Sequence, residues 1–189
     1  MNKASWGLSI VLLSALGTSI LFIHKEVALK SVASTRDIDS FMIDADYTQY
    51  DEDGNVHVRL ISPYMAHYRT NDRAFFRQPS LSGYTAERVP WQVTADHGKT
   101  LKGVNQVYFW DNVVLKQLSY PNHPDTTLIK TSTLMVYPKR SYAETDQAVT
   151  ITRPNSVAEG VGMQTDFKSG IMKLLSHATG DYVPPQNQS

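Results

Sequence analysis

The sequence predicts an all-β domain of stacked, paired strands behind one membrane-spanning helix. Three observations support this fold class. A charge-free run of twenty residues, 4–23, lies close to the start of the chain, and no helical period of useful length follows residue 40. Beyond that point, apolar β-formers alternate with polar residues between closely spaced Pro, Gly, Asn and Asp, which is the pattern of short antiparallel strands.

Residues 4–23 have the length and composition of a membrane-spanning helix. At 1.5 Å per residue such a helix covers about 30 Å, the thickness of the hydrocarbon core of a bilayer. A cleaved signal peptide is the alternative, but its apolar region is usually about 7–15 residues long and ends at an A-x-A-like site, which this run lacks. We therefore expect an uncleaved anchor after a short N-terminus, 1–3. The charges that flank the run leave its orientation open.

The remaining organisation follows from composition. Residues 24–40 are polar, as expected of a stalk. The β domain is expected at 41–183, followed by a polar tail at 184–189. At the start of the domain apolar and polar residues alternate, and Asp53-Gly54 predicts the turn of a hairpin. This acidic turn lacks the ligand spacing of a calcium loop, so a plain turn is the favoured interpretation.

Four windows, which begin at Leu60, Val93, Ile129 and Val161, share one pattern. Each places strand residues before a short polar or Pro/Gly step and then resumes as a strand. The windows recur about every 32–36 residues, which predicts stacked supersecondary units. A stack of this kind has an open edge at each end, where partners can add strands.

The segment 89–118 is the clearest of these units. In its first strand Trp91, Val93 and Ala95 alternate with polar residues, which predicts one buried face. The stretch 107–115 is instead apolar on both faces, more than one buried face requires. Either a second layer or a ligand is therefore expected to cover it, and its aromatic residues could belong to the core or to a groove.

The sequence argues against several other functions. Lys and Arg together number 18, as do Asp and Glu, and the basic residues are scattered, so nucleic-acid binding is not expected. The chain has no cysteine, and its six histidines are dispersed. Gly98-Lys99-Thr100 resembles the end of a phosphate loop, but Val93 stands where the first glycine must be. We expect no enzyme activity, no cofactor and no metal site.

Several motifs in order carry a family resemblance. They are the hairpin segment 50–60, the short runs 76–79 and 90–96, and the closing stretch 160–166. Together with the single span, they resemble the LptC family of lipopolysaccharide export proteins, whose periplasmic domain is a twisted open β-jellyroll of the kind found in LptA. The resemblance covers nearly the whole chain and departs from the family in the loop 120–125 and in the stalk.

The resemblance implies a single-pass protein of the cell inner membrane with a cytoplasmic N-terminus and a periplasmic domain. Such a protein receives lipopolysaccharide from an ABC transporter made of LptB, LptF and LptG and passes it to LptA. The alternative from another class is a membrane-tethered β-sandwich of the envelope, with a structural or carbohydrate-binding role.

The expected sites follow from the same resemblance. It implies that Gly54 takes part in docking to the transporter and that Phe76 lies on the lipid path. It also implies an edge for LptA in the last strands, assigned here to Ile171, Lys173, Leu175 and His177. The residues hypothesised to line the lipid groove are Phe41, Ile43, Ala45, Val58, Leu60, Phe76, Trp91, Val93, Leu134 and Val136. No catalytic residue is expected.

Overall fold

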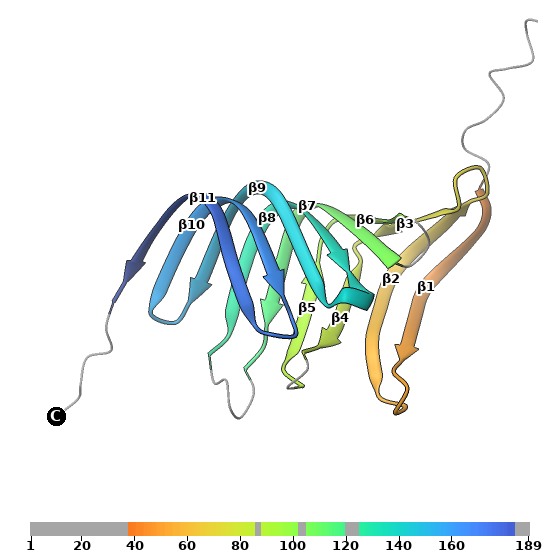
Figure 1. Ribbon diagram of the computed structural model, residues 1–189. Helices are drawn as coiled ribbons and strands as arrows, with labels where there is room; N and C mark the ends of the chain where they lie inside the picture. The colour runs from red at the N-terminus through yellow and green to blue at the C-terminus, as the bar shows by residue number, and fades with distance from the viewer. Residues whose placement is uncertain (1–37, 86–87, 102–104, 120–124, 184–189) are drawn as a thin grey trace, which may run out of the picture. The chain divides into compact units, whose positions relative to one another are not determined.

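The computed structural model describes residues 38–85, 88–101, 105–119 and 125–183 (Figure 1). In these ranges the chain forms eleven antiparallel strands and a short 3₁₀ helix, η3 (Pro138–Arg140), so the predicted all-β class is confirmed. The strands are β1 (Ile38–Tyr50), β2 (Val56–Tyr68), β3 (Arg73–Arg77), β4 (Ser80–Tyr84), β5 (Pro90–Thr94), β6 (His97–Leu101), β7 (Gln106–Gln117), β8 (Thr127–Tyr137), β9 (Tyr142–Arg153), β10 (Ser156–Asp166) and β11 (Ile171–Tyr182).

The N-terminal expectations lie outside these ranges. The predicted span, 4–23, and the polar tail, 184–189, are not among the described residues, and the expected stalk is described only from Ile38, where β1 begins. Within the described residues no helix has both the length and the apolar character needed to cross a bilayer. The anchor therefore stays a prediction.

All eleven strands belong to one antiparallel sheet. The predicted hairpin is present, because β1 pairs with β2 along its whole length. β2 then pairs with β3 and β4 in turn, β3 pairs with β6, β4 pairs with β5, and both β5 and β6 pair with β7. From β7 onward β8, β9, β10 and β11 follow in chain order. Among the described strands, β1 and β11 form the two ends of the sheet.

The long strands bend near their middle and arch over the interior (Figure 1). The bends coincide with left-handed backbone at Asp44 (φ 50°), Asp111 (φ 62°), Asn112 (φ 53°), Gly162 (φ 73°) and His177 (φ 50°). Hydrogen bonds continue across the bend, since Gln78 N donates to Asp96 O and Asp96 N donates to Asp111 O. The bends divide the sheet into two facing walls, which we name the β3/β6 wall and the β4/β5 wall after the short strands in each.

The recurrence seen in the sequence corresponds to this line of bends. The equivalent positions of the four windows are Ser62, Ala95, Thr131 and Met163, and all four lie at or beside a register change or a break between strands. Each recurring unit therefore supplies one arch of the sheet. The polar or Pro/Gly step in each window is the place where the chain turns from one wall to the other.

The core fills the space between the walls from β4 to β10. In the segment 89–118, Trp91, Val93 and Phe109 are at most 3% exposed, and Trp91 stacks on Phe167 with ring centroids 4.4 Å apart. The buried core consists of Val58, Leu81, Trp91, Val93, Ala95, Val107, Phe109, Val113, Leu115, Ile129, Leu134, Val136, Ala143, Val149, Ile151, Met163 and Phe167. One face of β7 thus belongs to the core, whereas Tyr108 and Trp110 on its other face are half-buried and carry no second layer among the described residues.

The outer faces of the two walls differ in composition. The β4/β5 wall presents mostly hydroxyl and amide side chains there, such as Ser82, Gln92 and Thr150. The β3/β6 wall presents aromatic rings together with basic side chains, and we call this surface the aromatic face. It consists of Phe41, Ile43, Tyr64, Tyr68, Arg73, Phe75, Arg77, Lys99, Tyr108, Trp110, Tyr137, Arg140 and Tyr142.

Candidate functional site

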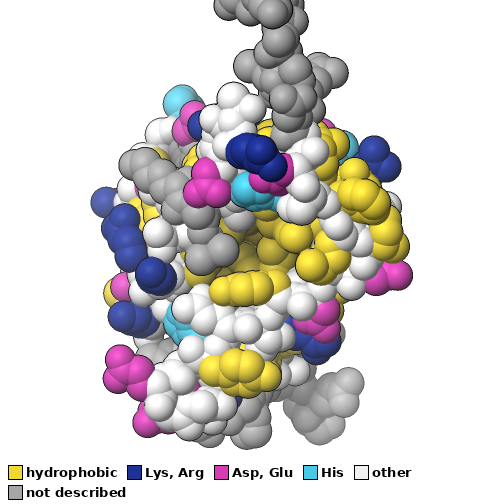
Figure 2. Space-filling view, turned by 90° about the vertical axis from the view of Figure 1, so that its right-hand side faces the viewer, with side chains coloured by type: hydrophobic (Ala, Val, Ile, Leu, Met, Phe, Trp, Pro, Cys, Tyr) yellow, Lys and Arg dark blue, Asp and Glu magenta, His cyan; other side chains and the backbone are white. Residues whose placement is uncertain are grey.

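The candidate site is an apolar cavity of about 360 Å³ between the walls at the β1 end of the sheet. Figure 2 looks onto this end and shows hydrophobic side chains lining a hollow. The volume lies within the range of about 300–1,000 Å³ that is usual for small-molecule sites. The lining residues are Met42, Ala45, Asp46, Tyr47, Gln49, Val58, Leu60, Met65, His67, Asp72, Ala74, Phe76, Leu81, Thr100, Val107 and Pro138.

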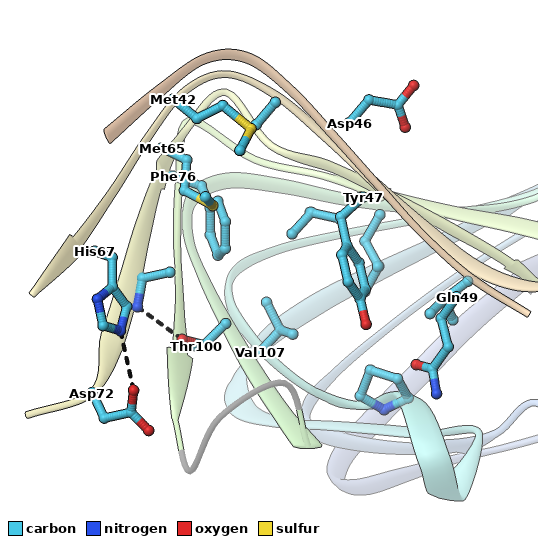
Figure 3. A pocket seen from close by; sticks show the side chains of 16 residues that line it. Met42, Asp46, Tyr47, Gln49, Met65, His67, Asp72, Phe76, Thr100 and Val107 are labelled. Carbon is cyan, nitrogen blue, oxygen red and sulfur yellow. Dashed lines mark hydrogen bonds and ion pairs between the residues drawn. The ribbon is translucent and has the colours of Figure 1, made fainter. Parts of the chain in front are cut away.

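Both walls contribute side chains to the cavity. Met42, Met65 and Phe76 extend into it from the β3/β6 wall, and the ring of Tyr47 enters from the other arm of β1 (Figure 3). Phe76 is 3% exposed, whereas Met42 is 48% exposed and Tyr47 46%. The cavity is therefore deep on its β3 side and open towards solvent along β1. An apolar ligand could reach it past β1 without unfolding the core.

The bend at Asp44 decides which residues of β1 face the cavity. It lies between the pairs Ile43–Tyr64 and Ala45–Ser62, and its positive φ shifts the alternation of side chains by one residue. Ala45 and Tyr47 consequently point inward beyond the bend. Before it Phe41 and Ile43 point outward and are 67% and 59% exposed.

A histidine with two carboxylates borders the cavity at the start of β1. His67 Nδ1 lies 2.7 Å from Asp39 Oδ1 and its Nε2 lies 3.1 Å from Asp72 Oδ1. The hydrogen bonds to Asp39 and Asp72 raise the pKa of His67, and the bond from His67 lowers the pKa of Asp39. This cluster links β1 to β2 and to the turn before β3. It is the main polar group at this rim.

The remaining polar groups around the cavity are satisfied within the protein. The guanidinium of Arg59 donates to the carboxylate of Asp46, with Nε 2.9 Å from Oδ1, and this bond lowers the pKa of Asp46. Thr100 Oγ1 accepts a hydrogen bond of 2.9 Å from Ala74 N, drawn in Figure 3. With its polar atoms paired in this way, the interior surface that is left for a ligand is apolar.

The structure distributes the ten hypothesised groove residues among three environments. Ala45, Val58, Leu60 and Phe76 line the cavity. Four others are at most 3% exposed and lie in the closed core, where other side chains occupy the space that a ligand would need; these are Trp91, Val93, Leu134 and Val136. The last two, Phe41 and Ile43, lie on the outer face of the sheet. The open cavity is therefore shorter than the sheet that contains it.

Several cavity residues were missed by the reasoning from sequence. Met42, Met65 and Ala74 line the cavity although the first two fall among residues that the alternation assigned to the outer side or left unassigned. The only signal in the sequence was the break itself, since Asp44 and Pro63 interrupt the two paired strands at the same level. Asp tolerates left-handed backbone better than most residues, which makes it a marker of such a bend.

The two predicted partner sites lie at opposite ends of the sheet. Gly54 has φ 81° in the β1–β2 turn, where Asp51 Oδ1 accepts hydrogen bonds from Asp53 N and Asn55 N. Ile171, Lys173, Leu175 and His177 are exposed on β11, which pairs only with β10 among the described strands. The structure thus brings neither set together with the cavity.

Comparison with known proteins identifies the family. Residues 8–183 match the family model described as lipopolysaccharide-assembly, LptC-related. A solved structure of LptH, the LptA-homologous periplasmic component of the lipopolysaccharide transport device of Pseudomonas aeruginosa, is similar in fold, with a TM-score of 0.54 and 11% sequence identity over 67% of this chain and 95% of that one. No curated protein matched the chain by sequence. The chain therefore belongs to the family of LptC-related lipopolysaccharide-assembly proteins, which gives it a role in lipopolysaccharide transport rather than in catalysis.

Proposed function

We propose that this protein accepts lipopolysaccharide from an inner-membrane transporter made of LptB, LptF and LptG, holds its acyl chains in the cavity, and passes it to LptA. The observation that carries this proposal is the open apolar cavity beside β1, an end strand of the sheet. A single helix at 4–23 would anchor the chain in the inner membrane, with a stalk at 24–40 and the β domain, 41–183, in the periplasm.

The energetics favour a shielded path for the lipid. Burial of an acyl chain contributes about 0.8 kcal/mol per CH₂, so a chain of twelve to fourteen carbons exposed to water costs on the order of 10 kcal/mol. Transfer between two similar apolar sites avoids this cost and is nearly isoenergetic. Direction must then come from the partner that hydrolyses nucleotide, since the sequence of this chain carries no nucleotide-binding motif.

The cavity favours lipid over the carbohydrate alternative. A sugar site needs polar side chains that converge on the ligand, whereas the polar atoms of Asp46, His67 and Thr100 are already paired with protein groups. The inner surface is otherwise formed by Met, Phe, Leu, Val and Ala side chains. A membrane-tethered β-sandwich with a purely structural role would in turn need no open cavity.

Photocrosslinking in cells can test the lipid path with neighbouring positions as a matched pair. We expect a photoreactive side chain at Met42, which lines the cavity, to capture lipopolysaccharide. The same group at Phe41, on the outer face of the same strand, should not capture it. Equal capture at both positions, or none at Met42 when Phe76 and Leu60 also fail, would overturn the proposed path.

The docking role of Gly54 can be tested by its backbone conformation. Its φ of 81° disfavours a β-branched residue, although a Cβ at this position would meet no neighbouring atom within 4 Å. We expect Gly54→Val to distort the turn and to weaken co-purification with LptF and LptG, while Gly54→Asn, which tolerates positive φ, retains it. Normal co-purification of the Val variant would show that the turn does not dock.

The β11 edge can be tested for contact with LptA in the same way. We expect a photoreactive group at Leu175, which is 48% exposed, to crosslink to LptA. Leu174 packs against the core on the opposite face of the strand and serves as the control. Crosslinks to LptA from neither residue would remove β11 from the proposed transfer route.

A further inference from the structure

The aromatic face of the β3/β6 wall has no role in the lipid path proposed above. It continues across β1, β2, β3, β6 and β7, where Phe41 stacks on Tyr64 at 6.4 Å, Tyr68 contacts Phe75 edge-on at 5.1 Å, and Tyr108 stacks on Trp110 at 5.7 Å. The core does not require these rings, because Phe109 and its neighbours already fill the inner side of the wall.

Basic side chains lie on these rings rather than in ion pairs. Arg77 Cζ is 4.9 Å from the ring centroid of Tyr64, Lys99 Nζ is 5.2 Å from Tyr108 and 5.5 Å from Trp110, and Arg140 Cζ is 5.1 Å from both Tyr137 and Tyr142. Such contacts orient a cation while leaving its charge available to a further partner.

The carboxylates that border the face are occupied by other groups. Glu144 accepts hydrogen bonds from the hydroxyls of Tyr137 and Tyr142, at 2.7 and 3.1 Å. Asp111 lies 3.2 Å from His97, and Asp39 bonds to His67. The aromatic face therefore presents positive charge among aromatic rings, and a complementary partner is anionic.

The outer face of the β4/β5 wall provides the internal comparison. There Arg59 is paired with Asp46, and the surrounding side chains are mainly Ser, Thr and Gln. The aromatic and basic composition is thus confined to one wall. It is also the wall in which the chain enters the domain, because Ile38 pairs with Tyr68 at the start of β1.

We propose that the aromatic face rests on the anionic phospholipid surface of the membrane in which the chain is anchored. Tyr and Trp favour the boundary between headgroups and acyl chains, and Lys and Arg are attracted to anionic headgroups. A broad, flat sheet face suits a bilayer better than it suits a small ligand, which needs a concave site. This inference rests on the proposed N-terminal anchor, although it is independent of the lipid path.

The anchor makes a weak attraction sufficient. Residues 24–37 separate the predicted span from β1, and an extended chain reaches at most about 3.3–3.6 Å per residue, so the domain stays within roughly 50 Å of the bilayer. Tethering at this range converts binding to the membrane into an intramolecular step. The aromatic face then sets which wall is turned towards the lipid and leaves the polar wall towards water.

The absence of cysteine allows a matched pair of labels in the full-length chain. Thr133→Cys lies beside Trp110 on the β3/β6 wall, and Thr150→Cys lies on the outer face of the β4/β5 wall; both side chains are half-buried. Each variant carries an environment-sensitive fluorophore and is reconstituted in nanodiscs of phosphatidylcholine, alone or mixed with phosphatidylglycerol, that contain lipids with a nitroxide on the headgroup. Incorporation into the nanodiscs is measured first.

We expect quenching at position 133 to exceed that at position 150 several-fold in the anionic nanodiscs, and to fall at high salt because screening weakens the attraction. Lys99→Glu in the Thr133→Cys background should abolish the difference, and Lys99→Arg should keep it. Equal quenching at both positions overturns the proposal, as does protection of position 133 only when LptF and LptG are present, which would assign the face to protein. A chain that fails to incorporate refutes the anchor and this inference with it, whereas capture of lipopolysaccharide at Met42 is scored separately.

Discussion

The two ends of the sheet enclose their interior differently. Between β7 and β10 the walls meet through side chains such as Leu134 and Val136, which are at most 1% exposed. Between β1 and β3 the same two walls leave a cavity whose edge is formed by Met42 and Tyr47. The packed part stabilises the arch, and the open part costs stability in exchange for space. A single fold can therefore hold a lipid only where its packing is incomplete.

The largest expected effect contrasts two leucines, one in each region. Leu134→Ala should lower the free energy of unfolding by about 2–5 kcal/mol, because it leaves a void in a closed core. Leu60→Ala removes the same atoms from the wall of a cavity that is already open, so a loss of only about 1–2 kcal/mol is expected. Chemical denaturation of both variants measures the difference. Similar losses would mean that the cavity is closed in solution.

Two alanines test the same contrast by adding volume. Ala143 is fully buried in the core, so Ala143→Phe should cost about 1–3 kcal/mol or more through overpacking. Ala74 lines the cavity, and Ala74→Phe should change stability little while it reduces capture of lipopolysaccharide by a crosslinker at Met42. Thermal unfolding and crosslinking yield are the two measurements. A Phe at position 74 that leaves capture unchanged would argue against occupancy of this cavity.

The bends of the two end regions differ in the residue that forms them. Gly162 has φ 73°, and a Cβ there would lie 2.9 Å from Leu175 Cδ1, so Gly162→Ala should cost about 1–2 kcal/mol. Asp44 holds a similar φ of 50° without being glycine, so Asp44→Gly should be neutral or slightly stabilising. Equilibrium unfolding of both variants compares them. A marked loss in Asp44→Gly would show that its side chain is needed at the bend.

The smallest expected effect concerns pH and the start of β1. Because Asp39 and Asp72 raise the pKa of His67, the folded state favours the charged imidazole. The resulting stabilisation is complete below the ordinary histidine pKa of about 6.5 and is lost as the pH rises through the raised pKa of the folded form. We expect amide protection in residues 40–43, corrected for intrinsic exchange, to fall over this range. His67→Gln should remove the pH dependence, and protection in β8 should not change.

The sequence predicted the fold class well because the governing patterns are local. Alternation around Trp91 and Val93, turn residues at Asp53-Gly54 and the recurrence of short breaks all report on neighbouring residues in the chain. The shape of the cavity is not local. Whether Leu134 meets other side chains or a ligand depends on the distance between two walls, which no pattern along one strand specifies.

The inward and outward positions of β1 failed for a related reason. Reading one alternation through 41–47 placed Phe41, Ile43 and Ala45 on one face, whereas the left-handed residue at Asp44 separates the first two from the third. The apolar character of β7 on both faces was correctly seen, but neither a second layer nor the cavity covers Tyr108 and Trp110 among the described residues. That unmet expectation is the origin of the membrane-facing proposal.

The bends also affect how the chain tolerates insertions and deletions. Because Asp44 restarts the alternation of side chains, the two arms of β1 keep independent parity. A deletion of one residue before the bend would exchange Met42 for its neighbours on the inner face and leave Ala45 and Tyr47 where they are. A deletion after the bend would do the reverse. The bends thus confine a frameshift in side-chain direction to half a strand, so the two walls can change their sequences separately.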